Sequence, residues 1–232
     1  MRENSVINIK KSHIVVLFIS LVVFGLITFT VQSFSVPLEN MEGDINDQFR
    51  SVYGTPGLDF DGGFFNDMMS FFTLLGESMS IVVITIILAA VLMIKRYTLL
   101  SFWVLAVVST GGLIGVLLKN TIERSRPSGH LAVDDGFSYP SGHSIASALL
   151  FLIIILVLIP HIKHQFLKYA AYTITVLIWM AVLYSRLYFG AHYLTDVLGG
   201  AFFALFYVLT AMYIYDKSSL WFKKYIFKRG RI

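Results

Sequence analysis

Six stretches of this sequence are long and apolar enough to cross a lipid bilayer. A membrane-spanning helix needs about 20 mostly apolar residues. Only 14% of the residues are charged, whereas a soluble domain usually carries about 25%. The pattern predicts an all-α, polytopic membrane protein, with six transmembrane helices in one bundle and a single domain over residues 1–232. The expected spans are residues 13–34, 76–94, 98–118, 144–160, 167–187 and 193–215.

The connecting segments differ in their content of basic residues, and this difference predicts the orientation of the chain. Thirteen of the eighteen Lys and Arg residues lie in the N-terminal segment, near Lys95, near Lys163 and in the tail after Asp216. Cytoplasmic segments of membrane proteins carry the excess of Lys and Arg, so both termini are expected in the cytoplasm. The other five lie on the outer side: Arg50, Lys119, Arg124, Arg126 and Arg186.

Three further segments have a simple interpretation. The first span is longer than the apolar part of a signal peptide and no small-residue cleavage site follows it, so we expect a retained helix. The outer segment 35–75 is expected to be a loop, in which residues 64–76 form either an amphipathic interfacial helix or an extension of the second span. The basic tail is expected to bind anionic lipid at the cytoplasmic surface, and no nucleic acid.

The first polar cluster is KNTIERSRP, directly after the third span. Lys119 and Arg126 are seven residues apart, so they would share a face if the helix continued that far. Pro127 would then force an extended exit. The alternative is that these long basic side chains reach from a helix end to the lipid head groups.

The second cluster is YPSGH, at the start of the fourth span. Ser141 is a favourable N-cap residue, and the short fourth span is expected to take its first turn from Ser141, Gly142 and His143. Gly142 lets the backbone approach a ligand closely, and the free N–H groups of a helix start can bind an anion. The alternative is an ordinary helix cap with a histidine facing the head groups.

The third cluster is SRLYFGAHYLTD, between the fifth and sixth spans. His192 and Asp196 are four residues apart, so on a helix they would lie on one face and form a hydrogen bond. A carboxylate on one imidazole nitrogen leaves the other nitrogen as a base or nucleophile. Arg186 precedes His192 across a turn that contains Gly190. A self-satisfied buried pair is the alternative, but ionisable residues at membrane depth are usually functional.

The predicted topology brings all three clusters to the outer surface of the membrane. Three cations, one helix N-terminus and two histidines would then surround a single small anion. Arginine forks and lysine point charges suit the oxygens of a phosphoryl group. The sequence therefore predicts a phosphate-binding site at the outer end of the bundle.

In these motifs the sequence resembles the type-2 phosphatidic acid phosphatase superfamily of integral membrane lipid phosphatases. That family carries K-x6-RP, PSGH and SR-x5-H-x3-D in this order. All three are present with matching spacing, as Lys119 to Pro127, Pro140 to His143, and Ser185 to Asp196. Members with a similar six-span plan are phosphatidylglycerophosphate phosphatase B-type enzymes and undecaprenyl pyrophosphate phosphatases of bacteria.

The resemblance implies a role for each motif residue. His192 would attack phosphorus and form a phosphohistidine, Asp196 would orient His192, and His143 would protonate the leaving group and then activate water. The phosphoryl oxygens would be held by Lys119, Arg126, Ser141, Gly142 and Arg186.

The same resemblance implies that no metal and no cofactor is needed. The sequence has no carboxylate cluster suited to Mg²⁺ near the motifs, since the adjacent Asp134 and Asp135 are expected to be a solvated loop. The expected substrates are lipid phosphates, namely undecaprenyl pyrophosphate, phosphatidylglycerophosphate or related lipids. An outward-facing site favours the pyrophosphate, which is released on that face. The alternative function is a transporter or binding protein that uses the same cluster as an anion site, although internal repeats and broken midplane helices are not visible.

Overall fold

The computed structural model describes residues 6–131 and 135–226, and these residues fold into helices without β-strands. Asp134 and the end of the basic tail from residue 227 lie outside the described residues. The all-α fold is confirmed. The helices are α1 Lys11–Ser33, α2 Ser35–Tyr53, α3 Phe64–Gly76, α4 Ser78–Ile94, α5 Thr98–Ile122, α6 Gly142–Ile153, α7 Gln165–Tyr188 and α8 Leu194–Tyr225. After α6 the chain continues as a π-helical turn, Ile154–Leu158, and a 3₁₀ turn, Ile159–His161.

The helices α1, α5, α6 with its continuation, α7 and α8 are each long and apolar enough to cross a membrane. A sixth crossing comes from the pair α3 and α4, which is bent by 61° between Gly76 and Ser78. Two cavities show that α4 runs the length of the bundle. Ser78 lines one cavity together with His143, whereas Leu92 lines another together with Val157, about four turns further along the fourth span. The six-span membrane bundle is therefore confirmed.

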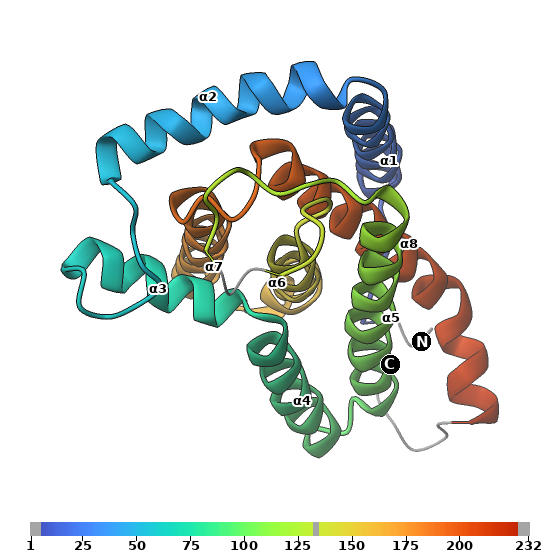
Figure 1. Ribbon diagram of the computed structural model, residues 1–232. Helices are drawn as coiled ribbons and strands as arrows, with labels where there is room; N and C mark the ends of the chain where they lie inside the picture. The colour runs from blue at the N-terminus through green and yellow to red at the C-terminus, as the bar shows by residue number, and fades with distance from the viewer. Residues whose placement is uncertain (1–5, 132–134, 227–232) are drawn as a thin grey trace.

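The fourth span forms the centre of the bundle. In Figure 1, which looks along several of the helices, α6 lies between α5, α7 and α8, and α1 packs on the outside against α8. Of the apolar window in Gly142–His161, 67% is buried, compared with 11% in α1 and in α7. The YPSGH motif therefore lies at the start of the most deeply buried helix of the bundle.

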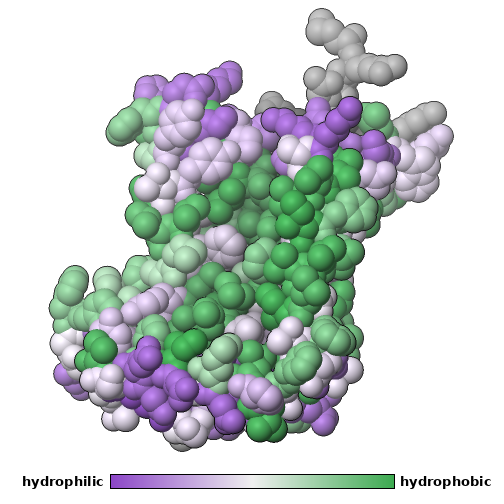
Figure 2. Space-filling view, turned by 90° about the horizontal axis from the view of Figure 1, so that it is seen from above, coloured by the Kyte–Doolittle hydropathy of each residue, from purple (hydrophilic) through white to green (hydrophobic). Residues whose placement is uncertain are grey.

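The outside of the bundle is apolar where a membrane would surround it. Figure 2 shows a broad apolar band between two hydrophilic ends. Large apolar side chains are exposed on the outer helices, among them Phe18 and Leu26 of α1 and Leu177 of α7. Because hydrocarbon chains solvate such side chains and water does not, this surface is that of a multi-pass membrane protein.

The segment 35–75 is more ordered than a loop. Its first half is the helix α2, which the sequence analysis did not predict, and which runs from the end of α1 across the bundle towards α3 (Figure 1). The helix α3 covers Phe64–Gly76, and its bend against α4 means that these residues are not a straight extension of the second span.

Candidate active site

The third span ends earlier than the spacing of the first motif suggested. The helix α5 stops at Ile122, because Glu123 adopts a left-handed conformation with φ of 54°. The helix does not continue to Arg126, so Lys119 and Arg126 do not share a helix face. The chain instead turns back over the bundle. Two backbone carbonyl groups hold Arg126, whose guanidinium donates to Ala191 O at 2.8 Å and to Gly136 O at 3.0 Å.

The YPSGH segment starts α6 as the sequence predicted. Ser141 is the N-cap, and its Oγ accepts a hydrogen bond from Ser144 N at 3.4 Å. The N–H of Ser141 donates to Asp196 O at 3.1 Å, which ties the start of α6 to the start of α8. A Cβ on Gly142 would meet nothing within 4 Å, so the first turn of α6 faces open space.

The third motif lies in the turn between α7 and α8. Gly190 has φ of 59°, which glycine adopts without strain. His192 precedes the first residue of α8, so it is not on the helix as expected, whereas Asp196 lies in the first turn of α8. The two side chains still meet, with His192 Nδ1 3.4 Å from Asp196 Oδ2, which is within ion-pair distance. Asp196 is completely buried, and its Oδ2 also accepts from Tyr193 N at 2.9 Å.

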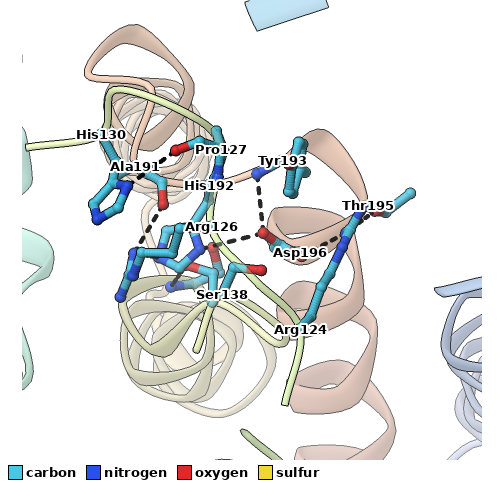
Figure 3. A network of polar contacts seen from close by, with 12 residues as sticks. Arg124, Arg126, Pro127, His130, Ser138, Ala191, His192, Tyr193, Thr195 and Asp196 are labelled. Atoms are coloured by element: carbon cyan, nitrogen blue, oxygen red, sulfur yellow. Dashed lines mark hydrogen bonds and ion pairs between the residues drawn. The ribbon is translucent and has the colours of Figure 1, made fainter. Parts of the chain in front are cut away.

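The three motifs meet in one cavity of about 410 Å³. It is lined by Ser78, Gly112, Gly115, Val116, Lys119, Arg126, Asp135, Gly142, His143, Ile145, Ala146 and His192. Both imidazoles therefore face the same space, together with two of the predicted cations. His192 Nε2 lies 3.4 Å from Arg126 Nη1 (Figure 3).

The other predicted residues lie directly behind this lining. Ser141 and Asp196 are buried at the junction of α6 and α8, and Arg186 is buried at the end of α7. The charges of Arg186, Lys119 and Arg126 all act on His143, as does His192. The sequence-predicted residues are thus brought to one place, and a dianionic group in the cavity would be attracted by three positive charges.

The cavity has one wall suited to hydrocarbon. It is lined by Gly112, Gly115 and Val116 of α5 and by Ile145 and Ala146 of α6. A Cβ on Gly112 would meet nothing within 4 Å, so the glycine leaves room on this side. Polar groups therefore lie at one end of the cavity, and apolar groups lie along the helices that contact lipid.

A buried ionic network behind the site was not predicted. Arg124 is 4% exposed and donates to Asp196 Oδ1 at 2.7 Å and to Glu42 Oε2 at 2.8 Å. Glu42, in α2, also accepts from the Thr195 N–H and hydroxyl, both at 2.8 Å. Figure 3 shows Asp196 between Arg124 on one side and the Tyr193 N–H and the His192 ring on the other. One indication of this network was present in the sequence: Arg124 is a basic residue on the predicted outer side, where few basic residues are expected.

Among the described residues, no group of three or more His, Asp or Glu side chains is arranged to hold a metal ion. Asp135 is exposed at the rim of the cavity, and its carbonyl accepts from Arg126 Nη2 at 2.9 Å. The positive charge in this part of the structure comes from side chains.

Comparison with known proteins agrees with this geometry. The model of the PAP2 superfamily matches residues 99–220, which is more than half of the chain. Phosphatidylglycerophosphatase B of Bacillus subtilis is 36% identical over 140 residues, covering 58% of this chain and 68% of that protein. A lipid A 1-phosphatase of Rhizobium etli is 31% identical over 147 residues, covering 56% of this chain and 58% of that protein.

A solved structure has the same fold. The crystal structure of a transmembrane PAP2-type phosphatidylglycerolphosphate phosphatase from Bacillus subtilis matches with a TM-score of 0.74 and 27% identity. The match covers 87% of this chain and 96% of that one. These relatives are named as phosphatases, which favours an enzyme over a transporter. The chain belongs to the PAP2 superfamily and is a membrane phosphatase.

Proposed function

We propose that this protein is a lipid phosphatase that works through a phosphohistidine on His192 and needs no metal ion. The observation that carries the proposal is the shared cavity, in which His143 and His192 face one space beside Lys119 and Arg126. Two imidazoles at one phosphorus can divide the work of nucleophile and general acid–base catalyst.

In the first step, Nε2 of neutral His192 attacks phosphorus, and the bond from phosphorus to the lipid oxygen breaks. His143, held as the imidazolium by the charge of the bound phosphate dianion, gives its proton to that oxygen. Asp196 lies 3.4 Å from the opposite nitrogen, Nδ1, so its carboxylate orients the ring and stabilises the positive charge that develops there.

In the second step, water attacks phosphorus and the bond to His192 breaks. His143 takes a proton from the water and returns to the imidazolium, while His192 returns to its neutral form. Lys119, Arg126 and Arg186 supply fixed positive charge for the phosphoryl oxygens in both steps, which is the role that metal ions have in other phosphoryl-transfer enzymes.

The apolar wall between α5 and α6 supports a lipid as the substrate. A phosphate group can enter the polar end while its hydrocarbon tails stay in the bilayer beside Gly112, Val116 and Ala146. The named activities of the relatives are consistent with this class. We expect undecaprenyl pyrophosphate and phosphatidylglycerophosphate to be hydrolysed, with the site at the outer membrane surface.

The proposal is tested by phosphate release from a panel of prenyl and glycerolipid phosphates in detergent, with EDTA present. The wild-type protein should release phosphate from several of them, and His192→Ala should lower the rate at least a thousandfold, since general acid–base groups alone contribute about 10²–10⁴-fold. His130→Ala is the matched control, because His130 lies outside the cavity lining. A strict requirement for Mg²⁺, or full activity of His192→Ala, would contradict the proposal.

A further inference from the structure

A second polar cavity, of about 520 Å³, lies at the opposite end of the bundle. The fourth span connects the two cavities, since it starts at Gly142 in the catalytic cavity and ends near Pro160 and His161, which line the second one. The helix α7 starts beside it, with Lys168 in its first turn, and ends near the catalytic histidine. We call this second space the distal cavity.

Basic side chains from two regions far apart in the sequence converge on the distal cavity. They are Lys10 and His13 at the start of α1, His161 after α6, and Lys168 of α7. None of the described residues that line it is acidic. An excess of positive charge in a concave, partly apolar site attracts anions. We therefore expect a negatively charged ligand in the distal cavity.

Hydrogen bonds fix what these groups can offer a ligand. His161 Nδ1 donates to Val157 O at 2.8 Å, and Lys168 Nζ donates to Pro160 O at 3.1 Å, which leaves two of its N–H groups. His13 Nδ1 accepts from Lys10 N at 3.3 Å, so its Nε2 carries the proton and donates. Ammonium and imidazole N–H donors of this kind make short, charge-assisted bonds to phosphoryl oxygens.

The two carbonyl groups that position His161 and Lys168 belong to an irregular helix end. Val157 lies in the π-helical turn and Pro160 in the 3₁₀ turn that follows it. Such π-helical turns inside helices occur frequently at functional sites. Here the irregular turns place the Lys168 ammonium group and the His161 imidazole at the same cavity.

The remaining wall of the distal cavity is apolar, with Ile155, Leu156, Tyr172 and Met212. Next to it, Phe166 and Leu167 at the start of α7 are exposed on the surface that contacts lipid. We propose that the distal cavity is a second phosphate-binding site, which takes the phosphate head group of an anionic phospholipid while the acyl chains lie along α7.

The test measures lipid retention on the full-length protein by native mass spectrometry after delipidation and addition of phosphatidylglycerol. The variant Lys10→Gln/Lys168→Gln removes two cations of the distal cavity. The matched control is Lys95→Gln/Lys163→Gln, which removes the same charge from exposed positions on the same predicted side. The cavity variant should bind at least tenfold more weakly than wild type, because it loses charge-assisted hydrogen bonds to the head group. The control should bind like wild type, and phosphatidylcholine should be retained poorly.

Further arms separate the alternatives. Lys10 is exposed, so Lys10→Glu alone disturbs no packing and should also weaken binding. The variant Lys119→Gln, which alters only the catalytic cavity, should keep the lipid in the distal one. If the Lys95→Gln/Lys163→Gln control loses lipid binding to the same degree, the proposal is overturned, because the lipid would then be attracted by surface charge in general and not by the distal cavity. Loss in Lys119→Gln, or displacement of the lipid by inorganic phosphate at equal concentration, would overturn it as well.

Discussion

Asp196 is the residue through which the surrounding structure acts on the nucleophile. Its carboxylate faces His192, accepts from the Tyr193 N–H and is bonded to Arg124. Burial alone would lower the pKa of Arg124, but the charge of Asp196 and the hydrogen bond and charge of Glu42 outweigh burial and raise it above its ordinary value. Arg124 therefore stays charged at neutral pH, and Asp196 has a cationic partner.

Glu42→Ala should destabilise the protein and slow catalysis. The change leaves Arg124 without one of its two buried carboxylate partners, and breaking a buried ion pair costs about 3–5 kcal/mol. A less firmly held Arg124 would let Asp196 move, so kcat should fall while KM changes little. Thermal unfolding in detergent and steady-state kinetics measure both effects.

Glu39→Ala is the matched control for this variant. Glu39 comes from the same helix and lies 3.8 Å from Arg124 Nε, but its side chain is 27% exposed, compared with 2% for Glu42. Its loss should change stability by less than about 1 kcal/mol. If the two variants behave alike, the buried network does not position the catalytic pair.

The motif residues could be predicted from the sequence, whereas their supporting residues could not. Lys119, His143 and His192 belong to motifs with fixed spacing. Each motif lies at the end of a predicted span, and the predicted topology puts these ends on the same side of the membrane. Glu42 lies 82 residues from Arg124 along the chain. The helix α2 around Glu42 could have been predicted, because its apolar residues recur with helical spacing, namely Leu38, Met41, Ile45, Phe49 and Val52. The contact of Glu42 with Arg124 depends on where this helix crosses the bundle, which the spacing does not give.

Among the elements, α6 and α8 make the approach on which the site depends. A Cβ on Gly200 would lie 3.0 Å from the Ser141 carbonyl oxygen and 2.9 Å from Ser144 Cβ. Gly199 similarly leaves room for the ring of Tyr139. The two glycines thus let the start of α8, with Asp196, pack against the start of α6, with His143.

Gly200→Ala should lower activity by moving α8 away from Ser141 and so separating His192 from His143. We expect at least a tenfold decrease in kcat/KM together with a lower unfolding temperature, since overpacking a filled site costs about 1–3 kcal/mol. Gly25→Ala in α1 is the control, because a Cβ there would meet nothing within 4 Å. The packing argument fails if Gly200→Ala retains wild-type activity.

The membrane-spanning elements were predictable because the thickness of the bilayer dictates their length and composition. The sequence-based ends of most spans lie within a few residues of the helices, as for residues 167–187 and α7, Gln165–Tyr188. The last helix is longer than its apolar part, since α8 continues to Tyr225. The π-helical turn after α6 left no trace in the sequence, because its residues are as apolar as the helix before it.

The whole molecule has two chemically different ends joined by an apolar band (Figure 2). One end holds the catalytic cavity and α2, and the other holds the distal cavity and the basic connections near Lys95 and Lys163. The number of crossings is even, so the start of α1 and the end of α8 lie at the same end of the bundle. The excess of Lys and Arg there predicts that this end faces the cytoplasm.

Cysteine labelling can test the orientation cleanly, because the chain has no cysteine of its own. Asp61→Cys and Lys163→Cys place single thiols at exposed positions on the two sides. A membrane-impermeant maleimide should label Asp61→Cys in intact cells and Lys163→Cys only after permeabilisation. The reverse pattern would place the catalytic cavity on the inner side and remove the argument for outer-surface substrates.

The most direct test of the central claim is to isolate the phosphorylated enzyme. The variant His143→Gln lacks the base that activates water, and a pyrophosphate substrate provides a leaving group that needs little protonation. Rapid quenching during turnover with labelled undecaprenyl pyrophosphate should give protein-bound phosphate that is stable in alkali and labile in acid, located on the peptide that contains His192. Phosphate released at an undiminished rate without any labelled protein, or label on another residue, would contradict the account.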